Sequence, residues 1–340
     1  MSFKILEADD FVVSSDSITS TLWSTDVQTL TTFFTSSVQK AGSSGDFYLS
    51  VYEADTLINT QFDIAYANST GLGGTYYNAA VVGKTPTLSS YGQYRALILE
   101  DENKSFNFGV GDNIHTATDF WALSIERSRY KESLFPGSLN LTLSGSNVDG
   151  TGMTIHLTDN SKDVAVNSFL GSTRVYQLVS GSSGTSNTLA NNGYVTGLGS
   201  YGLVFPELGT ILLNPQAISS SIQVDATRTA NSSNGVSAVT LFESIEAGGS
   251  FQLNSQETIT SDYIFARARN SEFNYTQNPT FISGSTGEVI YDNFINNPQT
   301  YITTIGMYNN TNELLAVAKL SRPLIKDFTK EALVRVKLDF

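Results

Sequence analysis

Residues 301–321 read YITTIGMYNNTNELLAVAKLS and carry the clearest structural signal in the chain. Two apolar segments flank the Asn-rich residues 309–312, and clusters of this kind favour turns. The stretch therefore predicts two strands joined by a turn. The last residues, 322–340, read RPLIKDFTKEALVRVKLDF. Apolar and polar residues alternate from Ala332 to Phe340, which predicts a final strand with one buried face.

The same alternation recurs in many short segments closer to the N-terminus. These segments are FYLSVY (47–52), QFDIAY (61–66), GSLNLTLSG (137–145) and GMTIHLTD (152–159). Each is bounded by residues that favour turns. Short strands at such spacing predict a mainly β fold of sandwich or jelly-roll type, with one or a few short helices.

The best helical pattern lies at residues 23–38. Apolar residues recur there at intervals of three and four, from Trp23 to Val38, and Thr25 with Gln28 fits a capping box. We expect a helix in this segment, although its many Ser and Thr residues are mediocre helix formers.

We expect two β-rich domains, with a boundary near residue 150 in the segment SGSNVDGTG. The first, 1–150, would hold the possible helix near 23–38, and the second, 151–340, would end in the hairpin and the final strand. Two Gly- and Asn-rich stretches, 67–86 and 180–202, are candidate functional or partner-ordered loops.

Composition excludes several classes of chemistry. The 340 residues carry a net charge of −13, which argues against binding nucleic acid, since that requires Lys and Arg to neutralise phosphates. The chain has no Cys, and thus no disulfide, catalytic thiolate or Cys-ligated metal. We expect no signal peptide and no membrane span, and folding in a cytoplasm.

The chain offers few candidates for catalysis. GLGSYG (197–202) matches a dinucleotide-binding pattern but is followed by Pro206, which prevents the required helix. His115 and His156 lie among turn residues and on a wet strand face. Calcium binding at the Asp-rich turns fits no EF-hand loop. We therefore predict no catalytic residue, no cofactor and no metal, and a protein that is not an enzyme.

Paired carboxylates remain the open alternative, because two such groups suffice for glycoside hydrolysis. The candidates are Glu53 with Asp55, residues 100–102, Asp119 with Glu126, and Glu243 with Glu246. A carbohydrate-binding or depolymerising β-protein would also use aromatic residues such as those in GTYYNAA (74–80) and NSEFNYTQ (270–277). Buried aromatic residues explain the composition equally well.

Residues 301–340 resemble the ending of virion structural proteins from contractile-tailed bacteriophages, especially cyanophages. Within them, ITTIGMYNNTNELLAVAKL (302–320) is similar to an I-x-x-I-G-L-Y…L-x-A-V element of tail-fibre and baseplate proteins. Residues 14–39, together with GDFYLSVY and QFDIAY, resemble the opening of the same class. YGQYRALILED (91–101) and residues 125–145 fit it too.

The resemblance implies a structural component of a phage virion, located in the tail baseplate region and acting through subunit interfaces. A neck, collar or fibre-attachment protein is the alternative position. The implied partners are other virion tail proteins and copies of the same chain, without nucleic acid or membrane. We expect interface roles for six residues of the hairpin, for which a plain core role stays open: Ile302, Ile305, Met307, Tyr308, Leu315 and Val317. PELGTILLNPQAI (206–218) is a further docking candidate.

Overall fold

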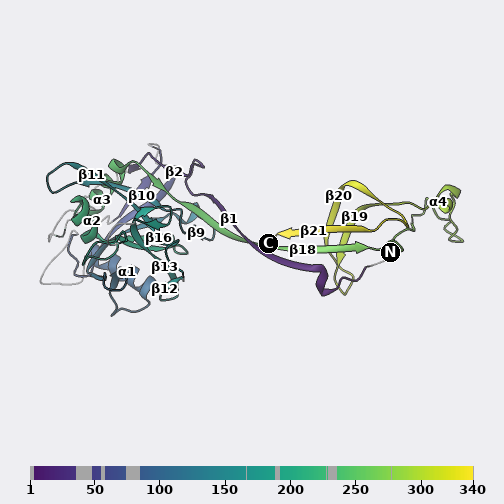
Figure 1. Ribbon diagram of the computed structural model, residues 1–340, viewed down its shortest axis with the longest axis horizontal. Coiled ribbons are helices and arrows are strands. Elements are labelled where there is room, and N and C mark those ends of the chain that lie inside the picture. Colours follow the sequence, from purple (N-terminus) through teal and green to yellow (C-terminus); the bar gives the residue numbers. More distant parts are fainter. Residues whose placement is uncertain are drawn as a thin grey trace. The chain divides into compact units, whose positions relative to one another are not determined.

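The computed structural model describes residues 4–35, 48–54, 58–73, 85–165, 167–187, 192–226, 228, 236–276 and 278–339. The protein is mainly β, as the sequence predicts. It divides into two compact units (Figure 1). Unit 1 comprises Met1–Ser17 and Thr258–Phe340, and unit 2 comprises Ile18–Glu257. The chain passes between them inside β1 (Phe11–Thr21) and β18 (Asn254–Ala268).

Unit 2 is built on one large antiparallel sheet with the strand order β2-β17-β10-β11-β13-β15-β16-β8-β5-β4-β3, while β12 and β14 pair with β13. The strands are β2 (Thr29–Leu30), β3 (Phe34–Thr35), β4 (Tyr48–Tyr52), β5 (Thr60–Asn68), β8 (Asp119–Ile125), β10 (Asn140–Ser146), β11 (Gly152–Asp159), β12 (Ser168–Leu170), β13 (Thr173–Ser182), β14 (Thr185–Ser186), β15 (Gly202–Phe205), β16 (Thr210–Leu213) and β17 (Phe251–Gln252). All four segments whose alternation predicts strands form strands.

Three helices and several small elements accompany this sheet. The helices are α1 (Pro86–Leu99), α2 (Pro215–Ile222) and α3 (Val236–Gly248). β6 (Phe106–Phe108) and β7 (His115–Ala117) form a separate ribbon, and β9 (Ser133–Leu134) pairs with the start of β18. A short 3-10 turn, η3, spans Arg127–Arg129.

The strand β8 shows why unit 2 has a large core. Trp121 and Leu123 pack in one cluster with α2 and α3, whereas the alternate residues Phe120 and Ala122 pack in a second cluster with α1. Both faces of the sheet are therefore buried, and the strand is apolar almost throughout. Trp23, Phe62 and Phe251 meet in the first cluster, with ring centroids 5.1 to 6.3 Å apart.

Unit 1 has fewer elements. The strand order β1-β18-β21 forms one sheet, in which β21 (Ala332–Asp339) pairs antiparallel with residues 261–268 of β18. The hairpin of β19 (Thr300–Tyr308) and β20 (Leu314–Lys326) is a separate two-stranded sheet. Two short helical segments, η1 (Ala8–Asp10) and α4 (Asp292–Asn296), complete the unit. The predicted hairpin and final strand are thus present.

The structure divides the chain differently from the predicted boundary near residue 150. Residues 147–151 form the turn between β10 and β11, where the Asn147 amide donates to the Thr151 carbonyl and the Gly150 amide donates to the Asn147 carbonyl. Their Gly and Asp residues mark a tight turn inside unit 2 and not a linker. Both segments that link the units are strands, so no Gly- or Pro-rich composition marks them.

The helix expected at 23–38 is wrong for the residues that the structure describes there, 23–35. Thr29–Leu30 and Phe34–Thr35 are strands, and Trp23 and Leu30 are buried in the core of the sheet. Residues 36–38 lie outside the described part. The β-branched Thr residues that weaken the helical pattern favour the extended backbone instead.

One helix is not predicted from the sequence, and one expected docking segment is core. YRALIL (94–99) lies in α1, which begins at Pro86, a residue that suits the first helical turn because it lacks an amide hydrogen. The proposed docking segment 206–218 is core, since Ile211, Leu212 and Leu213 are fully buried.

Candidate assembly surface

The hairpin β19–β20 is irregular at two points. Opposite Tyr308, β20 carries an extra residue, so that Met307 pairs with Ala316 but Tyr308 pairs with Leu314. A second shift lies between Ile302, paired with Leu324, and Thr304, paired with Lys319. Pro323 falls in this second shift, where a missing amide hydrogen costs no regular ladder bond.

The structure brings all six predicted interface residues into this hairpin. Ile302, Ile305 and Met307 are half-buried, while Tyr308, Leu315 and Val317 are exposed. Because Ile305 pairs with Ala318 and Met307 with Ala316, all of them half-buried, these four residues mark the more protected face. None of the six is enclosed in a core of its own chain, so their role at an interface stays a prediction.

The opposite face carries an exposed apolar patch. A Cβ atom on Gly306 would lie 2.9 Å from the Tyr308 ring and 3.2 Å from Leu314, so these two side chains cover the glycine. Val317 pairs with Gly306 across the hairpin and shares this face, as does Leu315 two residues before it. We call Tyr308, Leu314, Leu315 and Val317 the hairpin patch; their side chains are 39, 53, 67 and 57% exposed.

The base of the hairpin is held by a buried lysine. Lys326 is fully buried, and its Nζ donates to the Asn270 carbonyl (3.0 Å), the Asn274 side-chain oxygen (2.8 Å) and the Asp327 carbonyl (3.0 Å). These three neutral acceptors use all three donors of the ammonium group. Thr300, which pairs with Lys326, donates its hydroxyl to the Phe273 carbonyl. The loop at 270–274 is thereby fixed to the hairpin.

Beside this base lies an aromatic groove of about 840 Å³. Its lining includes six aromatic side chains and no Asp or Glu: Phe273, Tyr275, Phe281, Phe294, Tyr301 and Phe328. Phe281 also stacks edge-on with Tyr291 at 5.1 Å. Tyr301 and Tyr275 are more than half exposed. The groove has room for a ligand but lacks carboxylates to hydrolyse it.

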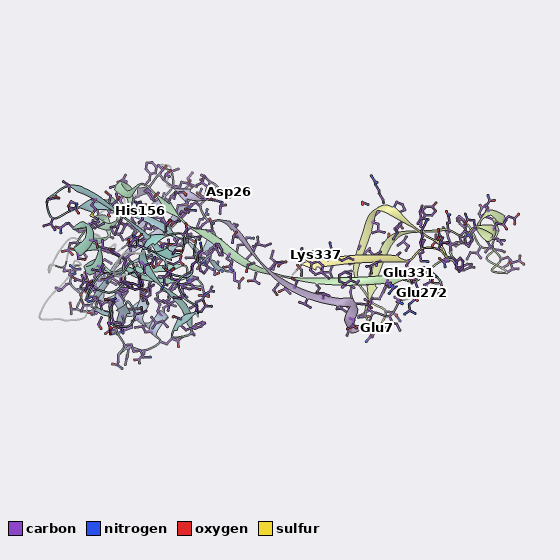
Figure 2. The ribbon with its side chains drawn as sticks, in the orientation of Figure 1. Glu7, Asp26, His156, Glu272, Glu331 and Lys337 are labelled. Carbon is purple, nitrogen blue, oxygen red and sulfur yellow. The ribbon has the colours of Figure 1, made fainter. Side chains whose placement is uncertain are left out.

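The strand β21 follows the hairpin in the sequence and carries exposed charged side chains. Arg335 and Lys337 lie over the Tyr263 ring at 5.5 and 5.9 Å, and Lys337 pairs with Asp339 at 2.8 Å. Figure 2 labels Lys337 and Glu331 on this part of unit 1. The hydrogen bond from Lys337 and a second from Ser261 hold the pKa of Asp339 below its usual value. These are surface interactions, which contribute little to folding stability.

Of the candidate carboxylate pairs, Asp119 and Glu126 lie too far apart to act together in glycoside hydrolysis. Asp119 is the first residue of β8, and Glu126 directly follows its last residue. At the usual rise of a strand the two residues lie roughly 20 Å apart. That separation exceeds what glycoside hydrolysis allows. Asp119 is instead buried and accepts from Arg228 Nε (2.6 Å) and the Tyr66 hydroxyl (2.8 Å). This contact joins the strands to the segment after α2.

The remaining pairs are structural or exposed. Glu53 accepts hydrogen bonds from Ser24 and Thr25, and Asp55 lies outside the described residues. Glu100 ends α1 and accepts from Ser172. Glu243 and Glu246 are exposed on α3. Hydrogen bonds from neighbouring hydroxyl groups thus account for the positions of Glu53 and Glu100.

One carboxyl group with a raised pKa was not singled out from the sequence. Burial raises the pKa of Asp63, the Ser50 hydroxyl at 2.6 Å opposes this, and the nearby Glu126 adds to it. The side chain lies on β5 between Ser50 and Ser124 of its neighbours. Sequence alone offers a weak signal, because QFDIAY places one acid in an otherwise apolar strand.

The other sequence candidates have structural explanations. His156 is exposed on β11 and contacts the Thr142 hydroxyl through Nδ1 (3.1 Å), and His115 is half-buried in β7. In GLGSYG, Gly199 has a φ of +75°, and an added Cβ would lie 2.1 Å from the Phe108 carbonyl oxygen. The glycine serves close backbone packing. Within the described ranges, no group of three or more His, Asp or Glu residues could hold a metal ion.

Among the described helices, none combines the length and apolar character needed to cross a membrane. No family model, no curated protein and no solved structure matches this chain.

Proposed function

We propose that the protein is a structural component of a bacteriophage virion, located in the tail baseplate region and acting through subunit interfaces. The observation that carries this proposal is the apolar surface of unit 1. Of 27 exposed large apolar side chains in the described residues, 18 belong to unit 1, although this unit has only 100 of the 340 residues. A concentration of exposed apolar side chains in one part of a protein favours a role in protein association.

The resemblance of residues 301–340 to baseplate and tail proteins supports the same proposal, because its central element forms the hairpin with the exposed patch. Assembly is a role that needs shape and apolar contact and no catalytic group. The protein would not act as an enzyme, and its partners would be other tail proteins and copies of itself. Position at the neck or collar, or at the attachment of a fibre, is the alternative within the virion.

Immunogold labelling of purified phage particles tests the proposal directly. Antibody raised against the native recombinant protein should label the distal end of the tail in electron micrographs. Gold at the head–tail junction would instead place the protein in the neck or collar. Particles that stay unlabelled, while the same antibody binds the native protein, would overturn the virion assignment.

A second function, carbohydrate binding, is favoured by the aromatic groove. Phe273 and Tyr275, which belong to the segment considered above for sugar stacking, both line it. A glycan array probed with the full chain and with Tyr275→Ala tests this function. Binding that depends on Tyr275 would establish it, and cleavage of the polysaccharide would require a carboxylate from elsewhere in the chain.

A further inference from the structure

The described residues of unit 1 form no hydrophobic core of their own. Among the described residues, only four apolar side chains of the unit are buried: Ile264, Ala268, Ala332 and Val336. All four belong to the β18–β21 ladder, in which Ala268 pairs with Ala332 and Ile264 with Val336. The hairpin β19–β20 contributes no buried apolar side chain. Burial of apolar surface is the main favourable term in folding, so this unit requires further burial elsewhere.

The hairpin shows where that burial is missing. A two-stranded sheet is at best marginally stable in water and needs a third strand or a covering surface. The residues of the hairpin patch stay 39 to 67% exposed, and they lie together on one face around Gly306. A covering partner would remove this patch from water.

The sheet of unit 1 also offers unpaired edges. In the strand order β1-β18-β21, β21 pairs with β18 and with no other described strand. Leu333, on its exposed side, is 64% exposed, and Val12 and Val13 of β1 are 49 and 67% exposed. Apolar edge strands are templates for pairing with another chain, and natural proteins usually protect them.

Charge favours unit 1 over unit 2 as the region through which two copies of this chain could meet. Unit 2 carries ten Lys and Arg against 20 Asp and Glu, whereas unit 1 carries nine against 12. Two copies would therefore repel each other strongly through unit 2, with its charge of −10, and only weakly through unit 1, with −3.

The charges of unit 1 are moreover separated along the chain. Residues 1–17 hold one Lys and four acidic residues, while residues 314–340 hold six basic and three acidic residues. Lys319 and Arg322 are exposed on the hairpin and form no ion pair with any other described residue. Each copy thus carries both an acidic and a basic segment, which are complementary between copies.

We propose that unit 1 is a self-association module, in which the hairpin patch of one copy is buried against unit 1 of further copies of the same chain. This proposal rests on the assembly role proposed above and names the partner at that surface. The acidic N-terminal segment of one copy faces the basic hairpin of the next. The missing core of unit 1 is completed between the copies, as in obligate oligomers.

Analytical ultracentrifugation of the full chain alone, over a wide range of concentrations, tests the proposal. We expect the wild type to sediment as an assembly of two or more chains. Leu315→Lys places a charge in the patch and should weaken association roughly tenfold or more, as loss of a central contact does. The matched control is Phe169→Lys, because Phe169 in β12 of unit 2 is similarly exposed, at 63% against 67%. It should leave association unchanged.

A second measurement keeps the test decisive if Leu315→Lys fails to fold. The chain has no Cys, so a single Val317→Cys carries one spin label per copy. Dipolar spectroscopy should then report short distances between labels in different copies. Labels at Phe169→Cys should report longer distances, or none. A wild type that stays monomeric, or labels at residue 317 without mutual coupling, would overturn the proposal.

The two proposals can fail separately. Recombinant protein that is monomeric, while the antibody labels the phage tail, would retain the virion role and assign the patch to a different tail protein. A self-associating chain absent from the virion would retain the module and remove the proposed location.

Discussion

The two units of this protein differ in how many apolar side chains they bury. Unit 2 buries 49 apolar side chains among its described residues and exposes nine large ones, whereas unit 1 buries four and exposes 18. Unit 2 therefore has a large core of its own, with both faces of its sheet covered. Unit 1 has ordered strands but no such core. Regular secondary structure alone thus does not indicate an independent domain, and in unit 1 its stability depends on association.

The ionisable groups show the same contrast. In unit 2 burial raises the pKa of Asp63. In unit 1 the pKa of Asp327 is lowered by a hydrogen bond from Thr329, and that of Glu272 by the Arg269 amide and Lys4, all at the surface. Burial is the dominant cause at Asp63, whereas hydrogen bonding at the surface is the dominant cause at Asp327 and Glu272.

The largest effect should come from the core of unit 2. Phe62 is fully buried between Trp23 and Phe251, so Phe62→Ala leaves a cavity in a packed aromatic cluster. We expect a loss of about 3–5 kcal/mol in the free energy of unfolding, measured by chemical denaturation. Phe169→Ala removes an exposed side chain of the same unit and serves as the control. A similar loss from both changes would contradict the assignment of Phe62 to the core.

The buried Lys326 tests what holds unit 1 together. Lys326→Met keeps the length of the side chain but leaves the Asn274 oxygen and two carbonyls without their donor. Since an orphaned buried acceptor costs about 1–3 kcal/mol, amides in 270–274 should exchange hydrogen roughly 10- to 100-fold faster.

The control for this change is Lys330→Met. Lys330 is exposed and pairs only with Asp327, three residues earlier, so its loss should leave exchange at 270–274 unaltered. Unchanged protection in Lys326→Met would show that the loop is held by other contacts, such as the Thr300 hydroxyl.

The strands were predictable from sequence because their pattern is local. Alternation in residues 47–52, 61–66, 137–145 and 152–159 reports one buried face, and each segment forms a strand. The hairpin at 301–321 was visible for the same reason. The candidate interface residues within it could be named, since an apolar residue in a short hairpin must pack against something. The register shift at Tyr308 decides which face of the hairpin is exposed, and the amino-acid composition does not predict this shift.

The failures of sequence reasoning have physical causes. The division into units depends on which distant strands pair, and β1 and β18 are some 240 residues apart in the chain. α1 was missed because its Ser and Gly residues obscure the helical period, and its hydrophobic faces point to a sheet buried on both sides. The segment 206–218 is apolar because it is core, and an apolar run alone does not distinguish core from a docking site.

The raised pKa of Asp63 makes the folding stability of unit 2 depend on pH in a predictable way. Because burial raises its pKa above the ordinary 3.8, the protonated form favours the folded state, and this contribution is lost as pH rises through the folded-state pKa. At neutral pH the buried charge is a cost that Asp63→Asn removes. We expect the variant to be more stable than the wild type at pH 7, with the gain vanishing towards pH 4, in denaturation experiments at both values.

The control is Asp149→Asn at the surface of the same unit. A hydrogen bond from Thr151 lowers the pKa of Asp149, so the sign reverses and the charged form favours folding above the ordinary pKa. This variant should lose stability at neutral pH. A stabilised Asp149→Asn, or a destabilised Asp63→Asn, would contradict the assignment of burial as the cause at Asp63.

The smallest expected effect concerns the charges at the proposed contact between copies. Lys319→Glu with Arg322→Glu reverses two exposed basic side chains of the hairpin without touching the hairpin patch. Exposed pairs contribute about 0.2–1 kcal/mol each, so association should weaken several-fold, and mainly at low salt. Sedimentation at low and high ionic strength measures this difference. The same change of charge in unit 2, Lys104→Glu with Lys162→Glu, is the control. If both double variants weaken association equally, net charge alone governs it; an effect confined to the hairpin would place Lys319 and Arg322 at the contact, because screening acts on charges that face each other across it.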